Sequence, residues 1–135
     1  MTIRLNGCSK EYIEFSNSSN IYGTHISCNL MVSSSVFQVN KKFDFEINLA
    51  KSLIAALKEF TQSPKKFESI KLASSVYEEE CICFSGDSLG HIEIVGTLVQ
   101  YGHLTQKLEF AFITDQTIIK DFTIEFEKLI NISKA

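Results

Sequence analysis

Hydrophobic and polar residues alternate along much of the chain with a period of two, which is the pattern of half-buried β-strands. The alternation is clearest over residues 25–32 and 37–47. Three consecutive serines at 33–35 separate these segments and have the composition of a turn. The two segments therefore predict an antiparallel hairpin with one buried face.

Shorter stretches with the same signal predict further strands. In one of them Gly96 lies on the apolar side, where a missing side chain indicates a bulge or close packing. The polar run at 16–20 reads as a loop after the first of these strands. The further strands are expected at residues 12–15, 70–72, 80–84, 91–100 and 108–112.

Two segments change to helical periodicity, each with one apolar stripe. The first covers about residues 49–62, follows Asn48 as an expected N-cap and ends before Pro64. The second covers about residues 116–131 and follows Asp115, whose carboxylate can cap it. A one-sided helix needs an apolar surface to cover, so both are expected to lie on the sheet.

The order of strands, helix, strands and helix, without a repeat or a Pro- or Gly-rich linker, predicts a single α+β domain over residues 1–135. Strands joined by short turns favour antiparallel pairing. We therefore expect a single antiparallel β-sheet of about six to eight strands with two α-helices. The phenylalanine-rich faces of these elements would form the core.

Composition limits the classes of function. The net charge is −3 with no cluster of basic residues, so no direct nucleic-acid partner is expected. No apolar run is long enough to cross a membrane, and the first residues lack the features of a secretion signal. These features predict a cytoplasmic location without membrane contact, and therefore free thiols at the four cysteines.

The charge is unevenly distributed. Residues 1–67 carry eight basic and five acidic groups (+3), whereas residues 68–135 carry five and eleven (−6). Glu78, Glu79 and Glu80 are consecutive and are interpreted either as a solvated turn or as an acidic docking patch, continued by Asp87. An acidic patch would attract a basic partner and speed association.

A second contact candidate is the segment at 100–103, expected to form a hairpin between strands. If the turn is solvated, Tyr101 and His103 are exposed there. The two alternatives are that these side chains pack on the edge of the sheet or that they contact a partner. Together with the four carboxylates they form the predicted partner-binding set. The set is Glu78, Glu79, Glu80, Asp87, Tyr101 and His103.

Three short motifs could carry chemistry. Residues 86–89 read Gly-Asp-Ser-Leu, the string of the GDSL hydrolases, in which Ser88 would be the nucleophile. The string lies mid-chain before a strand, without the family's later Asp-x-x-His pair, and is better interpreted as a hairpin turn.

Two pairs of residues have side chains that bind metals: His91 with Glu93, and Cys81 with Cys83. Neither pair has further ligands at a recognisable spacing. We therefore expect no enzyme activity, metal or cofactor.

Three segments of the C-terminal third form a distinctive series: residues 90–96 (Gly-His-Ile-Glu-Ile-Val-Gly), 108–112 (Leu-Glu-Phe-Ala-Phe) and 114–117 (Thr-Asp-Gln-Thr), which lead into the final helix. This series carries a resemblance to the WapI family of bacterial immunity proteins. It implies a non-enzymatic cytosolic protein that binds and neutralises a cognate toxin with a basic surface, such as the nuclease domain of a contact-dependent or polymorphic toxin. The alternative is a small-ligand-binding or structural domain with a pocket on the concave face of the sheet.

Overall fold

The computed structural model describes residues 1–134 and contains eight strands and two helices. The expected α+β character is confirmed. No helix among the described residues is long and apolar enough to cross a membrane. The elements are β1 (Thr2–Asn6), β2 (Tyr12–Ile21), β3 (His25–Ser33), β4 (Gln38–Glu46), α1 (Ile47–Gln62), β5 (Phe67–Ala73), β6 (Cys81–Gly86), β7 (His91–Gln100), β8 (Gln106–Asp115) and α2 (Gln116–Lys134).

The strands form two four-stranded antiparallel sheets, so the prediction of a single sheet is wrong. Sheet A has the order β1-β2-β3-β4 and sheet B the order β5-β6-β7-β8. Helix α1 separates the two sets of strands along the chain, and four strands followed by a helix therefore occur twice. The sequence shows no repeat because the two halves share this order of elements without sharing residues.

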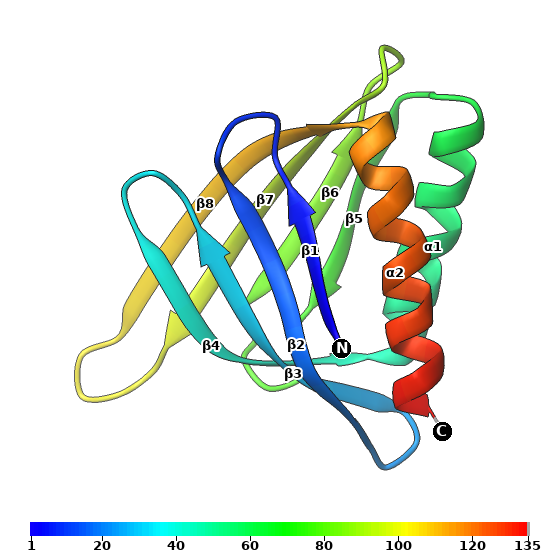
Figure 1. Ribbon diagram of the computed structural model, residues 1–135. Helices are drawn as coiled ribbons and strands as arrows, with labels where there is room; N and C mark the ends of the chain where they lie inside the picture. Colours follow the sequence, from blue (N-terminus) through cyan, green and yellow to red (C-terminus); the bar gives the residue numbers. More distant parts are fainter. Residues whose placement is uncertain (135) are drawn as a thin grey trace.

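The two sheets meet at both ends of the strand order. At one end Phe45 of β4 forms an isolated antiparallel bridge with Ser74, just after β5. At the other end the amide of Cys8 donates to the carbonyl of Ile113 in β8, at 2.8 Å. Figure 1 shows the sheets as two walls that face each other, with α1 and α2 side by side along one side.

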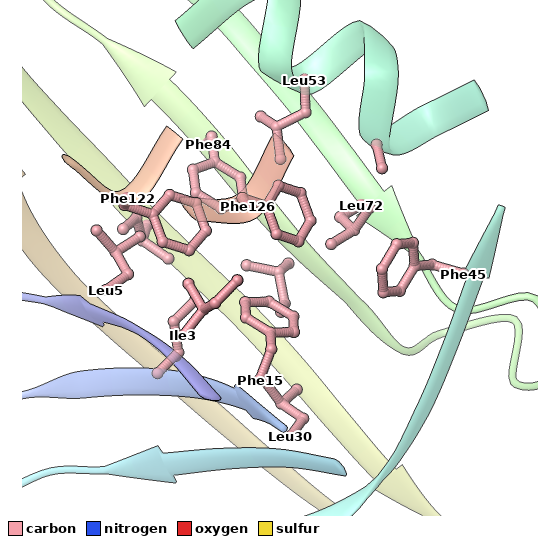
Figure 2. Packing of buried hydrophobic residues seen from close by; sticks show 14 of the residues in the cluster. Ile3, Leu5, Phe15, Leu30, Phe45, Leu53, Leu72, Phe84, Phe122 and Phe126 are labelled. Carbon is pink, nitrogen blue, oxygen red and sulfur yellow. The ribbon is translucent and has the colours of Figure 1, made fainter. Parts of the chain in front are cut away.

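The core fills the space between the sheets and the helices. Phe15 of β2 lies with its ring centroid 5.3 Å from Phe126 of α2, and Phe45 of β4 lies 6.1 Å from the same ring. Phe84 contributes from sheet B (Figure 2), and its side chain is also fully buried. Aromatic rings from both sheets and from α2 therefore share one cluster, as the phenylalanine content predicted.

The first turns of the two helices are capped in different ways. Asp115 caps α2, since its Oδ1 accepts a hydrogen bond from the amide of Ile118 at 2.9 Å, as expected. Helix α1 begins earlier than expected: Asn48 lies inside it, and Glu46 occupies the N-cap position without a side-chain hydrogen bond. The amide of Ile47 instead donates to the carbonyl of Thr24 (2.9 Å), so a neighbouring loop provides the cap.

Two strand predictions need correction. Strand β1 was not predicted, although Ile3 and Leu5 are buried on its inner side. Strand β2 continues through the polar run at 16–20, which was expected to be a loop. The pairing with β3 shifts register between Ser16 and Ser19, and Asn17 has a φ of 51°. Hydrogen bonding to β3 thus holds a segment in the sheet that has little apolar signal of its own.

Gly96 is a point of close packing, which is one of the two alternatives that its position on the apolar side predicted. It lies opposite Phe110 in the pairing of β7 with β8. The Phe110 ring occupies the space that a side chain at position 96 would need. The glycine therefore lets an aromatic ring lie across the neighbouring strand.

We predict that Gly96→Ala lowers the free energy of unfolding by about 1 to 3 kcal/mol, because the added methyl group displaces the Phe110 ring. Gly102→Ala is the matched control, since no atom lies within 4 Å of a Cβ placed there. Urea unfolding of both variants measures the difference. Equal stability of the two variants would contradict the packing role.

Candidate functional site

A groove of about 740 Å³ lies between β4 and the end of the β7–β8 hairpin, with the β5–β6 loop as its third wall. It exists because the strands of sheet B differ in extent. Cys81, the first residue of β6, pairs with Thr97, whereas β7 continues to Gln100. The hairpin therefore extends past its neighbours and faces β4 across an opening. The lining includes Val39, Lys41, Asp44, Tyr77, Glu80, Leu98, Tyr101 and Leu108.

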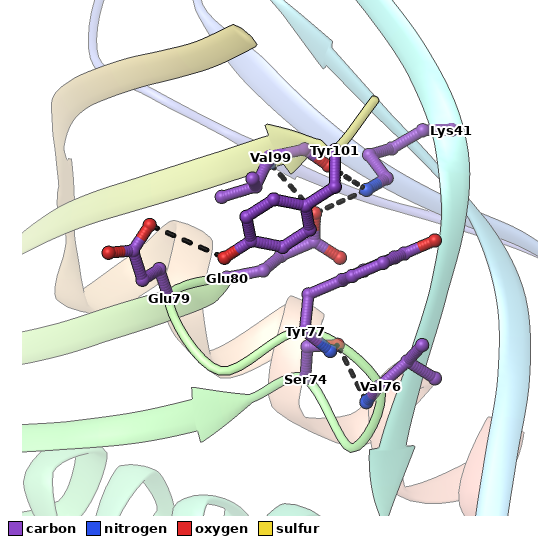
Figure 3. Close-up of polar contacts among 8 residues, drawn as sticks. All are labelled: Lys41, Ser74, Val76, Tyr77, Glu79, Glu80, Val99 and Tyr101. Atoms are coloured by element: carbon purple, nitrogen blue, oxygen red, sulfur yellow. Dashed lines mark hydrogen bonds and ion pairs between the residues drawn. The ribbon is translucent and has the colours of Figure 1, made fainter. Parts of the chain in front are cut away.

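An ion pair between Lys41 of β4 and Glu80 crosses this groove (Figure 3). Lys41 also donates from Nζ to the carbonyl of Val99 in β7, at 2.7 Å. The amide of Val99 donates to Oε2 of Glu80 at 3.0 Å. The Glu80 side chain is fully buried, and that of Lys41 is 21% exposed.

These contacts replace missing sheet hydrogen bonds. Strand β6 begins at Cys81, so it offers no backbone partner to Val99. The Glu80 carboxylate and the Lys41 ammonium take that place and connect sheet B to sheet A. Within the described residues, Oε1 of Glu80 and Oδ1 of Asp44 are buried without a hydrogen-bond partner. Such atoms are costly to bury and are rare in folded proteins.

The loop that positions Glu80 is held by its own hydrogen bonds. The Ser74 hydroxyl accepts from the amides of Val76 and Tyr77, both at 3.1 Å. The amide of Ser74 donates to the carbonyl of Glu80 at 2.8 Å, and that of Ser75 donates to the carbonyl of Asp44 at 2.8 Å. The loop is therefore anchored to β4 as well as closed on itself.

Two tyrosines lie over the buried ion pair. The rings of Tyr77 and Tyr101 are 5.5 Å apart between centroids, and Lys41 Nζ lies 4.6 Å from the centroid of Tyr77. The Tyr101 hydroxyl donates to Oε2 of Glu79 at 3.4 Å, and Lys107 lies 2.7 Å from the same oxygen. The hydrogen bond and charge of Lys107 lower the pKa of Glu79, whereas partial desolvation and the Glu79 carboxylate raise the pKa of Tyr101.

Two exposed side chains form the rim of the groove: Val76 in the β5–β6 loop and Tyr101 in the β7–β8 turn. Leu104 in the same turn as Tyr101 and Val36 in the β3–β4 turn are also exposed, but they do not line the groove. Large exposed apolar residues in loops next to a hollow are typical of a contact surface. The rim is therefore suited to binding, and the ion pair below it is part of the framework.

The predicted partner-binding residues are not one patch. Glu80 is buried and bound to Lys41, so the expectation of three solvated carboxylates in a row is wrong at this position. Glu78 is exposed, and Glu79 and Tyr101 meet at the rim. His103 is exposed in the β7–β8 turn. A partner role for these exposed residues stays a prediction.

Asp87 lies at the opposite end of β6 from Glu80 and does not continue the acidic patch, contrary to the prediction. Its Oδ1 accepts hydrogen bonds from the amides of Leu89 (2.9 Å) and His91 (3.0 Å). The bond from His91 and the further bond from Leu89 lower the pKa of Asp87. The side chain therefore stabilises the β6–β7 turn.

The other motifs lie where the sequence placed them. Residues 86–89 end β6 and enter the turn before β7, as predicted, and Ser88 is exposed there. His91 and Glu93 share the exposed face of β7. The sulfur atoms of Cys81 and Cys83 are 3.8 Å apart on one face of β6. Among the described residues, no three His, Cys, Asp or Glu side chains gather as a metal site.

Sequence reasoning missed the contribution of β4 to the groove. One signal was present: Lys41 interrupts the apolar side of a strand that also carries Val39, Phe43 and Phe45. A lysine on a buried face needs a partner of opposite charge. The identity of that partner, Glu80, depends on how the two sheets come together.

We predict that Glu80→Gln lowers the free energy of unfolding by about 3 kcal/mol at neutral pH, because the Lys41 ammonium loses its buried counter-charge. Urea unfolding measures the change, and the double variant Lys41→Met, Glu80→Gln should recover part of the loss. Glu79→Gln is the matched control, which breaks an exposed ion pair and should leave stability nearly unchanged. A similar effect of Glu80→Gln and Glu79→Gln would contradict the structural role.

Comparison of the sequence with protein-family models and with curated proteins finds no match.

Proposed function

We propose that this protein is a non-enzymatic immunity protein that binds a cognate protein toxin and neutralises it by covering the toxin's active surface. The observation that carries the proposal is the groove, whose rim presents exposed Val76 and Tyr101 on separate turns around a buried framework. Aromatic side chains held at the edge of a hollow are effective anchors in protein interfaces.

The toxin as partner is supported by the resemblance of residues 90–96, 108–112 and 114–117 to the WapI immunity family. In this fold those residues have structural roles. Gly90 has a φ of +91° in the β6–β7 turn, Gly96 accommodates Phe110, and Asp115 caps α2. The resemblance therefore falls on the framework, and specificity for one toxin is expected in the loops around the groove.

Charge supports a basic partner. The segment from residue 68 onward has eleven acidic and five basic residues. Lys107 compensates Glu79, and Lys41 compensates Glu80, so Glu78 is the member of the acidic run left to act on an approaching molecule. Long-range attraction of this kind raises the rate of association more than the affinity.

Co-expression with the toxin encoded beside its gene tests the proposal. We expect the two proteins to co-purify and the growth of toxin-producing cells to be restored. Absence of both binding and rescue would contradict the immunity role.

Once the complex is isolated, Tyr101→Ala should raise its dissociation constant about tenfold or more. Glu78→Lys should slow association and weaken the dependence of the association rate on salt. Leu89→Ala, an exposed apolar residue in the β6–β7 turn, is the matched control.

A second candidate function is the binding of a small ligand, which the same groove favours. Its volume lies in the range of ligand sites, and charged atoms of Lys41, Asp44 and Glu80 converge on it. Native mass spectrometry of protein purified from the producing cell should then show an added mass that is lost on denaturation. A native mass equal to that of the bare chain would contradict this function.

A further inference from the structure

Strand β4 is an edge strand that is open along the groove. It pairs with β3 over its whole length, from Gln38 to Glu46. On its other edge it forms the bridge between Phe45 and Ser74. Within residues 1–134, no strand pairs with that edge from residue 39 to residue 43. Open edges of this kind accept extended peptides by strand addition.

The direction of the unpaired groups follows from the strand geometry. The carbonyl of Asp44 points away from β3, because it accepts from the amide of Ser75. Backbone groups alternate between the two edges of a strand. The amides and carbonyls of Asn40 and Lys42 therefore point to the same open edge as the carbonyl of Asp44, beside the groove.

The far wall of the groove is the end of β7, which β4 reaches through a side chain. Lys41 spans the gap from β4 to the carbonyl of Val99. A gap between the edge of β4 and the end of β7, bridged by a side chain instead of by sheet hydrogen bonds, is a place where an added segment can lie. The exposed rim residues Val76 and Tyr101 lie beside it and would pack on that segment.

A second observation indicates what the added segment carries. Oε1 of Glu80 and Oδ1 of Asp44 line the same groove, are buried, and have no hydrogen-bond partner among the described residues. Figure 3 shows the Glu80 carboxylate beneath the Tyr101 ring and close to Tyr77. A guanidinium supplies several donors in one plane and also packs well on tyrosine rings, so it satisfies both features.

The basic residues of the groove do not prevent a guanidinium from binding there. Lys41 is bound to Glu80, and Lys107 is bound to Glu79, so both are compensated. Lys42 and Asp44 also line the groove and offset each other in charge. Oε1 of Glu80 and Oδ1 of Asp44 therefore remain without a hydrogen-bond donor among the described residues.

We infer that the groove binds an extended segment of a protein partner, which pairs with the open edge of β4 and directs an arginine side chain toward Glu80 and Asp44. The inference rests on the proposed function only in taking the segment to belong to the toxin. Peptide binding by β4 can be measured without the toxin.

The test uses the full chain and blocked heptapeptides of alternating valine and threonine with arginine at the centre. The control peptide carries norleucine at the centre, which keeps an unbranched apolar stem like that of arginine and lacks the guanidinium with its donors. In ¹⁵N-resolved NMR we expect saturable shifts at the amides of Asn40, Lys42 and Tyr101, and an affinity about tenfold or more lower for the norleucine peptide. Shifts confined to other edges, or equal affinity of the two peptides, would overturn the inference.

A second test of peptide binding uses variants of the chain. Asn40→Pro removes an amide that points to the open edge and no hydrogen bond to β3, so the fold should persist while peptide binding is lost. Ala111→Pro is the matched control on the open edge of β8, where the carbonyl of Ile113 marks the outward direction. Circular dichroism and urea unfolding verify that both variants fold. Retained binding in folded Asn40→Pro would overturn the inference.

A pair of side-chain variants adds a measurement that leaves β4 intact. Tyr101→Ala should weaken peptide binding about tenfold, and Leu104→Ala, in the same turn but outside the groove lining, should not. Peptide binding without toxin binding would support the groove and contradict the immunity role. Toxin neutralisation that survives Asn40→Pro would support the immunity role and overturn the groove as the site of contact.

Discussion

The arrangement of this protein depends on burying one apolar face of each four-stranded sheet. Successive side chains of a strand point to opposite faces of its sheet. Each sheet therefore has an apolar face that its own strands cannot cover and that another element must cover. Phe15 and Phe45 from sheet A and Phe84 from sheet B are fully buried, and Phe122 and Phe126 of α2 stack on each other beside Phe15. One helix thus completes a core that both sheets share, and α1 packs beside it.

Closure of the core on the side of the helices leaves an opening between β4 and the β7–β8 hairpin. Polar backbone groups at that opening are satisfied by side chains, since the Lys41 and Glu80 pair serves the amide and carbonyl of Val99. The same residues therefore support the fold and form the floor of the groove. This is the physical reason that Glu80 is unavailable as a surface docking residue, while Glu78 and Tyr101 above it are exposed.

The division between floor and rim gives the proposed binding role a physical basis. A buried, hydrogen-bonded framework holds the loops in fixed positions, so a partner does not have to order them on binding. The rim residues belong to turns that can change without disturbing the core. Substitution of Val76 or Tyr101 would therefore change the proposed contact surface and leave the framework intact.

The sequence by itself determined the local elements. Alternation of period two identified the hairpin of β3 and β4 and the extent of β7, while helical periodicity located α1 and α2. The cap at Asp115 involves the amide three residues later, and the close packing at Gly96 involves Phe110 in the adjacent strand. These features depend on contacts whose partners lie nearby or directly across one strand pair.

Only the tertiary structure decided the number of sheets, the groove and the state of the charges. Periodicity shows which face of a strand is buried and carries no information on what covers it, so one sheet and two sheets give the same pattern. The burial of Glu80 depends on Lys41, 39 positions earlier in the chain. Asp87 is separated from Glu80 because β6 runs between them as an extended strand. Charge and burial are thus settled by long-range pairing, which no local window of sequence contains.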